Sequence, residues 1–199
     1  MDRWEINGDI LEFDEETHTY WVNGEKHPSV TQVLKFKFSN KYDGVDEAVL
    51  RRAAEKGTEL HESIEIYETY GITSEELQEF RNYLFLKQQF KFDVVECEKP
   101  IILKYKDLVV CGRLDLVLKD NGKACLGDIK RTSVLDKEYL AYQLNLYRLA
   151  YQQCYGELIE GLRGIHLRKE KRKYLELPIN EEITYQLLEE YIGGMNERN

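Results

Sequence analysis

Two short segments place acidic side chains beside a lysine in apolar surroundings. In the run Gly127–Lys130, residues two apart on a strand point to the same face, so Asp128 and Lys130 project together while Ile129 enters the opposite layer. The preceding apolar run carries Asp115, and a hairpin between the two strands would bring its carboxylate within reach of Asp128. Two like charges side by side repel, and each raises the other's pKa, unless a cation or divalent metal lies between them. The pattern therefore favours a metal site.

A third acid comes one strand earlier. Glu98 would complete a cluster of hard oxygen ligands with Asp115 and Asp128, and such ligands suit magnesium or manganese. Glu96 has the same strand parity as Glu98, and Pro100 marks the end of strand pairing without favouring either glutamate. Both glutamates therefore remain candidates for the third ligand.

Two helical segments add further polar side chains. Gly57 and His61 are one turn apart, and a glycine inside a helix loses stability in exchange for close approach of a backbone or ligand, which His61 would face. Gln143 and Tyr147 are also one turn apart and offer an amide and a phenol on one helix face. These two side chains could orient a substrate phosphate or Lys130.

Residue patterning indicates the elements that must position these side chains. The first thirty residues predict a small hairpin. Ser29 is placed to cap a short helix, a longer helix is expected over 46–70 with Gly71 ending it, and another over 74–90. After these, strands are expected over 94–103, 108–118, 123–131, 162–168 and 174–177. Helices are expected over 135–154, before the last two strands, and after 178–180.

This order is typical of one α/β domain, with an N-terminal extension over 1–45 and a core over 46–199. At 199 residues with 42% hydrophobic residues, the chain lies well outside the disordered and collagen-like classes. The net charge of −9 argues against a protein that coats nucleic acid through bulk charge. A local basic groove is still compatible with this net charge. For the dense basic run 168–173, the alternative is a solvated hairpin tip. The groove would use Lys35, Lys37, Lys41, Arg51, Arg52, Lys56 and the run 168–173.

Other sequence features bear on compartment and cofactors. The chain has no run of eighteen apolar residues and no secretory signal pattern, so we expect a cytoplasmic protein of a bacterial or phage-infected cell, with no membrane partner. The four cysteines are widely separated and are expected as reduced thiols, mostly buried. No G-x-x-x-x-G-K-[ST] phosphate loop is present, so no nucleotide cofactor is expected.

Together these motifs resemble the PD-(D/E)XK nuclease superfamily and, within it, the RecB-like branch with its phage-type exonucleases. The matching motifs, in that family's order, are Gly57-Thr58-x-x-His61, Glu98-x-Pro100, Gly112-Arg113-x-Asp115, Asp128-x-Lys130 and Gln143-x-x-x-Tyr147. His18-Thr19-Tyr20 and Pro28-Ser29-Val30-Thr31 are similar to the amino-terminal segment of phage-type members. The resemblance spans about residues 18–151, and Leu114 stands where the superfamily has its named proline.

The resemblance implies a restriction-endonuclease-like αβββαβ core, with a central mixed sheet flanked by helices. It implies a Mg²⁺- or Mn²⁺-dependent deoxyribonuclease, an exonuclease of recombination or repair that acts on DNA. A single-strand annealing protein or helicase as partner and a homo-oligomeric assembly remain open. No iron–sulfur cluster is expected, because Cys97, Cys111 and Cys125 lie inside strands and no cysteine follows Cys154.

The resemblance also implies residue roles. Divalent metal would be bound by His61, Glu98, Asp115, Asp128 and the carbonyl of Ile129. Lys130 would orient or deprotonate the attacking water, and Gln143 and Tyr147 would support Lys130 and the DNA strand. Thr58 and Arg131 would contact substrate.

Each residue taken alone has a plainer interpretation. Asp128 and Lys130 could form an exposed ion pair, His61 a satisfied helix histidine, and Glu98 a solvated strand residue. Tyr147 fits an apolar helical stripe with Leu140, Leu144 and Tyr151. At the level of function, the alternative to a nuclease is a non-catalytic DNA-binding or assembly module that keeps the nuclease fold.

Overall fold

The computed structural model describes residues 1–39 and 46–196, apart from the side chains at positions 47, 49–51, 53, 54 and 196. Its central sheet has the strand order β5-β6-β7-β8-β9, in which β7 and β8 are parallel and all other neighbours antiparallel. The strands are β5 (Asp93–Tyr105), β6 (Leu108–Asp120), β7 (Lys123–Lys130), β8 (Gly161–Arg168) and β9 (Lys171–Leu177). Asn121 and Gly122 both have positive φ at the β6–β7 turn, as expected for an Asn-Gly hairpin.

The parallel pair requires a crossover, because the end of β7 and the start of β8 lie at opposite ends of these two neighbouring strands. Helix α4 (Lys137–Tyr155) provides it. With α3 (Gln78–Phe90) in front, the chain runs α3-β5-β6-β7-α4-β8, the predicted αβββαβ order. The predicted fold class is therefore confirmed: a mixed five-stranded sheet flanked by helices, with an added N-terminal antiparallel sheet.

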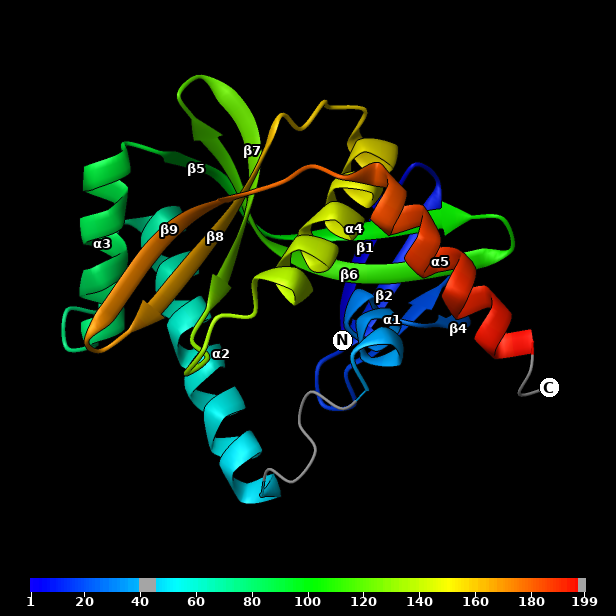
Figure 1. Cartoon of the computed structure of the whole chain (residues 1–199), viewed down its shortest axis with the longest axis horizontal. Coiled ribbons are helices and arrows are strands. Elements are labelled where there is room, and N and C mark those ends of the chain that lie inside the picture. Colours follow the sequence, from blue (N-terminus) through cyan, green and yellow to red (C-terminus); the bar gives the residue numbers. More distant parts are fainter. Residues whose placement is uncertain (40–45, 197–199) are drawn as a thin grey trace.

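Helices cover both faces of the central sheet (Figure 1). Helices α2 (Glu47–Tyr70) and α3 pack on one face, where Phe80 and Tyr83 contact the apolar side chains of β6–β8. Helices α1 (Val30–Lys37), α4 and α5 (Glu181–Asn196) cover the other face together with the N-terminal sheet. Strand β7 shows the alternation that this requires, because Leu126 belongs to the α4 core and Ile129 to the α2–α3 core.

The N-terminal segment forms a four-stranded antiparallel sheet, so the prediction of a single hairpin was too small. Its strands are β1 (Asp2–Ile6), β2 (Asp9–Asp14), β3 (Thr19–Val22) and β4 (Glu25–His27). The missed strand β1 precedes an Asn7-Gly8 turn with positive φ at both residues, which is the usual sequence signal of a tight hairpin. The sheet joins the core through a bridge between Ser29 and Cys111.

Most helix boundaries agree with the predictions. Ser29 caps α1 in a full capping box with Gln32, and Gly71 ends α2 with φ +71° and an N–H bond to the Tyr67 carbonyl. The exception is α3, which begins at Gln78, because Ser74–Leu77 forms a turn closed by the Leu77 N–H and the Ser74 carbonyl. No helix in the described part of the chain has both the length and the hydropathy needed to cross a bilayer.

Candidate metal centre and its basic cleft

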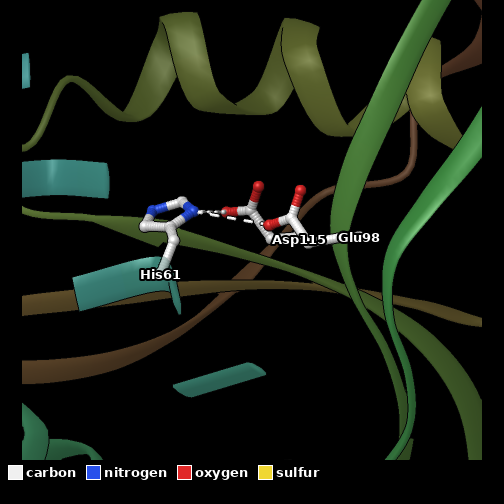
Figure 2. Close-up of side chains that lie close together, drawn as sticks. All are labelled: His61, Glu98 and Asp115. Atoms are coloured by element: carbon white, nitrogen blue, oxygen red, sulfur yellow. Dashed lines mark ion pairs between the residues drawn. The ribbon is translucent and has the colours of Figure 1, made fainter. Parts of the chain in front are cut away.

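Side chains from α2, β5 and β6 meet at one point of the described structure. The ligand atoms of His61, Glu98 and Asp115 all lie within 4.8 Å of one another. His61 Nδ1 is 3.8 Å from Glu98 Oε1 and 3.7 Å from Asp115 Oδ2 (Figure 2). Residues far apart in the sequence thus converge, and two of the three acids predicted from the sequence are in this cluster.

The backbone of β5 explains why Glu98 reaches the cluster. Cys97 pairs with Leu116 and Lys99 with Leu114, so Glu98 lies opposite Asp115. Glu98 also has φ +48°, a left-handed conformation that disfavours a side chain by about 1–2 kcal/mol. Backbone strain of this kind persists where the surroundings fix the residue, and it concentrates at functional sites.

Arg113 is the residue that fixes Glu98, and the sequence reasoning gave it no role. Its Nε lies 2.7 Å from Glu98 Oε2, which leaves Oε1 to face His61. A guanidinium binds a carboxylate with defined geometry, so it orients the ligand as well as balancing its charge. The signal in the sequence was the position of Arg113, two residues before Asp115 on the strand paired with Glu98.

The structure separates the two candidate glutamates. Glu96 forms an ion pair with Lys99, three residues along the same strand, and is absent from the cluster. Glu98 is therefore the third acid that the fold brings to His61 and Asp115.

Asp128 and Lys130 share one face of β7, as strand parity predicted. Lys130 Nζ lies 2.5 Å from Asp128 Oδ2, and the Asp128 side chain is 1% exposed, which rules out the surface ion pair of the plainer interpretation. Apart from this ion pair, neither carboxylate oxygen has a hydrogen-bond partner in the described structure. Burial raises the pKa of Asp128 to about 6, and the Asp115 charge adds to that rise while Lys130 opposes it. Asp128 lies outside the three-residue cluster, but the Asp115 charge raises its pKa and the His61 charge lowers it.

Backbone groups of Ile129 contact two members of the cluster, Asp115 and His61. Its N–H donates to Asp115 Oδ2 at 2.7 Å, and its carbonyl, predicted as a metal ligand, lies 3.2 Å from His61 Nε2. Because Nε2 faces that carbonyl, Nδ1 is the nitrogen that faces the carboxylates, where the neutral ring could offer its lone pair to an ion and the charged ring directs its proton at the acids. Burial disfavours the charged form of His61, but the Asp115 and Glu98 carboxylates outweigh it and raise the His61 pKa to about 9.

Helix α4 supplies the remaining predicted residues. Gln143 and Tyr147 are both buried, and Gln143 Oε1 has no hydrogen-bond partner in the described structure. Burial raises the pKa of Tyr147 well above its ordinary value, and the nearby Asp115 and Asp128 charges add to this rise. A Cβ at Gly112 would lie 2.9 Å from the Tyr147 ring, so the glycine admits the tyrosine. Tyr147 thus belongs to the apolar core and faces the acids as well.

The structure bears on two further predictions for α2, those for Thr58 and Gly57. Thr58 is exposed and lines neither of the cavities considered below, so the structure gives no support to its substrate contact. No described atom lies within 4 Å of a Cβ placed on Gly57. Of the two expected causes of a glycine here, a backbone or a ligand, no described backbone approaches Gly57, and the space beside it is open to a ligand.

A basic cleft of about 580 Å³ lies beside this centre, between α2 and the β8–β9 turn. Its cationic lining residues are Arg52, Lys56, Arg131, Arg168, Lys169 and Lys171. Arg131 directly follows Lys130 and is oriented by a 2.6 Å ion pair with the buried Glu79. The cleft thus begins at the end of β7 that carries Asp128 and Lys130.

The predicted basic groove is realised only in part. Arg52, Lys56 and much of the run 168–173 line the cleft, but Lys35 and Lys37 lie on α1, and Lys37 pairs with Glu190 at 3.0 Å. Lys41 and the side chain of Arg51 lie outside the described residues. Arg172 is turned to the side, with its guanidinium 3.6 Å from the centre of the Phe85 ring.

Comparisons with known proteins give a fold neighbour but no family. No protein-family model matches the chain, and no curated protein is significantly similar to it. Among solved structures, the crystal structure of SSO0001 is similar over 84% of this chain and 75% of its own, with 18% sequence identity and a TM-score of 0.49.

Proposed function

We propose that this protein is a Mg²⁺- or Mn²⁺-dependent deoxyribonuclease that hydrolyses phosphodiester bonds. The observation that carries the proposal is the convergence of His61, Glu98 and Asp115 beside the buried Asp128–Lys130 pair. Acidic ligands from separate strands next to an amine are the groups that metal-assisted hydrolysis of a phosphodiester requires.

The donor set fits such a metal. Carboxylate oxygens suit Mg²⁺ and Mn²⁺, and an imidazole nitrogen is better tolerated by Mn²⁺. Among the described residues, the buried oxygens of Asp128 form an ion pair with Lys130 and no further hydrogen bond, and burial raises the Asp128 pKa. We assign His61, Glu98, Asp115 and Asp128 as the residues that would hold the ion. A bound divalent ion would lower the pKa of a water and stabilise negative charge on the phosphate.

The residues around the acids have separable tasks. Arg113 holds Glu98 in place, and the Ile129 N–H holds Asp115. Lys130 presents an amine on the same face as Asp128, where it can orient the attacking water or take its proton. The Gln143 amide and Tyr147 phenol lie on the α4 side and can position the phosphate or the Lys130 amine.

The basic cleft supports a polymeric, phosphate-bearing substrate. Phosphate binding depends on local cations, so the cleft can bind a DNA backbone although the whole chain carries a net charge of −9. Arg131 lines the cleft and directly follows Lys130 in the chain, so a strand bound there would lie near the end of β7 that carries Asp128 and Lys130.

The test is cleavage of linear DNA with Mg²⁺ or Mn²⁺, compared with a chelator. Asp115→Asn should reduce cleavage by about 10³-fold or more, since it replaces an anionic metal ligand by a neutral amide, whose oxygen can still accept the Ile129 N–H bond. Asp107→Asn is the matched control, because Asp107 is exposed at the β5–β6 turn and should leave the rate unchanged.

Unchanged cleavage by Asp115→Asn would remove the proposed centre. A folded wild-type protein that binds DNA yet never cuts it, with either metal, would instead favour the non-catalytic binding module. A closed circular substrate run in parallel separates exonuclease from endonuclease action, because only an endonuclease can open it.

A further inference from the structure

We infer that a cavity beside α1, which shares Glu98 with the metal centre, is a nucleotide pocket for the residue adjoining the scissile phosphate. The inference deepens the proposed function and rests on it, because the metal centre identifies the ligand as part of a nucleic acid. We call this cavity the α1 pocket. It is lined by residues that include His18, Gln32, Lys35, Glu98, Arg113 and Tyr147.

The location of the α1 pocket ties it to the metal centre. Glu98 belongs to the three-residue cluster and also lines the pocket, and Tyr147, which faces the acids, forms another part of its wall. The volume is about 440 Å³, within the range of roughly 300–1,000 Å³ found for small-molecule sites. A ligand in the pocket would therefore lie directly beside the metal ligands.

The N-terminal sheet and α1 build the opposite wall. The pocket takes residues from the β2–β3 loop and from the first turns of α1, which are the two amino-terminal motifs, 18–20 and 28–31, that the metal centre leaves without a role. The Ser29–Cys111 bridge attaches this wall to β6, the strand that carries Asp115. The added sheet thus completes a cavity that the αβββαβ core alone would leave open.

One cation of the pocket is free to bind a phosphate. Lys35 is exposed and forms no ion pair within the described residues, whereas Arg113 is already held by Glu98 at 2.7 Å. An ammonium group binds phosphate as a compact point charge without a fixed geometry. Lys35 can therefore bind the phosphate that follows the nucleotide next to the metal centre.

Rings and an amide suit the rest of a nucleotide. The rings of Tyr20, Phe13 and His18 form a stack, with centroid separations of 4.4 Å and 5.9 Å, and His18 is its exposed end. A base can stack on such an exposed end whatever its sequence. Gln32 uses its Oε1 in the helix cap with the Ser29 N–H at 2.8 Å, which turns its NH₂ group outward as a donor for a base or sugar oxygen.

The α1 pocket and the basic cleft have no lining residue in common. The cleft uses α2 and the β8–β9 turn, and the pocket uses α1 and the N-terminal sheet, which lie apart in Figure 1. Glu98 of the metal centre lines the pocket, and Arg131, which directly follows Lys130 in the chain, lines the cleft. A strand that crosses the centre would place its backbone in the cleft and one nucleotide in the pocket.

The test is an NMR titration of the ¹⁵N-labelled full chain with dAMP in the presence of a chelator, so that neither metal nor cleavage contributes. We expect amide shifts at His18 and over 29–35. Lys35→Gln should weaken dAMP binding about threefold to fivefold and leave deoxyadenosine binding unchanged. His18→Asn should weaken both ligands about fivefold, because it removes the ring while asparagine tolerates the φ of +48° at this position.

Lys123→Gln, at the exposed β6–β7 turn, is the control and should change neither ligand. Absence of shifts at the α1 pocket, or shifts confined to the basic cleft residues 168–171, would overturn the inference. Inorganic phosphate that reproduced every dAMP shift would also overturn it, since the pocket would then bind an anion and no nucleoside. Either result would leave the nuclease proposal unaffected, because that proposal is tested by the cleavage assay, which uses neither Lys35→Gln nor His18→Asn.

Discussion

Asp128 is a carboxylate removed from water, with an ion pair to Lys130. Such a group destabilises the metal-free protein, because burial makes its ionised form costly and the nearby positive charges offset this cost only in part. The same feature that makes the site able to bind a divalent ion therefore lowers the stability of the metal-free chain.

Asp128→Asn should accordingly stabilise the metal-free protein at pH 7.5, by up to about 3 kcal/mol. The folded pKa of about 6 lies above the ordinary value of 3.8, so ionisation destabilises the fold progressively as pH rises through that interval. The advantage of the variant should shrink toward pH 4, where wild-type Asp128 is protonated. Urea denaturation in a chelator at several pH values measures it.

The Asp107→Asn variant supplies the baseline for an exposed aspartate. Loss of stability in Asp128→Asn, or a stability difference that does not vary with pH, would show that Lys130 compensates the charge of Asp128 fully.

Residue types and spacing were sufficient to predict most of the candidate centre. Asp115 and the facing pair Asp128 and Lys130 followed from strand parity, whereas His61 was expected as a ligand from the family resemblance, and the structure brings these residues near one another. The choice between Glu98 and Glu96 could not be made, because it depends on a positive φ that no parity rule contains. Arg113 was missed for a related reason, since its role depends on which glutamate faces it.

At the scale of elements, α2 contains a glycine, Gly57, that lowers the stability of the helix although no described neighbour requires a residue without a side chain. Gly57 has a helical environment with open space around its missing Cβ. Glycine inside a helix is less favourable than alanine because it loses more backbone freedom on folding.

Gly57→Ala should therefore raise the free energy of unfolding by about 0.5–1 kcal/mol, measured by urea denaturation. Gly71→Ala tests the opposite case in the same helix, because its φ of +71° disfavours any side chain, and it should destabilise the protein. A destabilising Gly57→Ala would contradict the open environment of this position. If DNA passes close to α2, the alanine should lower cleavage while the protein becomes more stable.

Elements were predicted best where a periodic pattern ended at a capping residue. The α2 and α4 segments had apolar periodicity and clear end signals, and their observed bounds lie within two residues of the expected ones. The start of α3 was misplaced, because Ser74 with two following glutamates resembles a helix start and instead forms a separate turn. The β1 strand was missed because it is short and mostly exposed, so it has little apolar pattern.

At the scale of the whole molecule, charge is distributed unevenly. A net charge of −9 coexists with a cleft whose lining is mainly cationic. The affinity for DNA should therefore depend on a small number of cations and fall steeply with salt.

Replacing Lys169 and Lys171 together by glutamine should reduce the slope of log K against log salt by about 2, since each lost phosphate contact contributes roughly 0.9. Fluorescence anisotropy of a labelled duplex over a salt series measures this slope. The turnover number at saturating DNA should change little, because neither lysine belongs to the metal centre. The pair Lys119→Gln and Lys123→Gln, near the β6–β7 turn, should leave the slope unchanged. An equal slope for both double variants would place the bound DNA outside the cleft.

The crossover between β7 and β8 has a consequence for biosynthesis. Strand β7 carries Asp128 and Lys130, but its parallel partner β8 is made only after the whole of α4. On the ribosome, an emerging chain holds β7 as an unpaired edge until Arg168 has left the exit tunnel. We therefore expect nascent fragments that end before β8 to be inert toward nucleic acid, so that the chain gains its centre only after β8 has been synthesised.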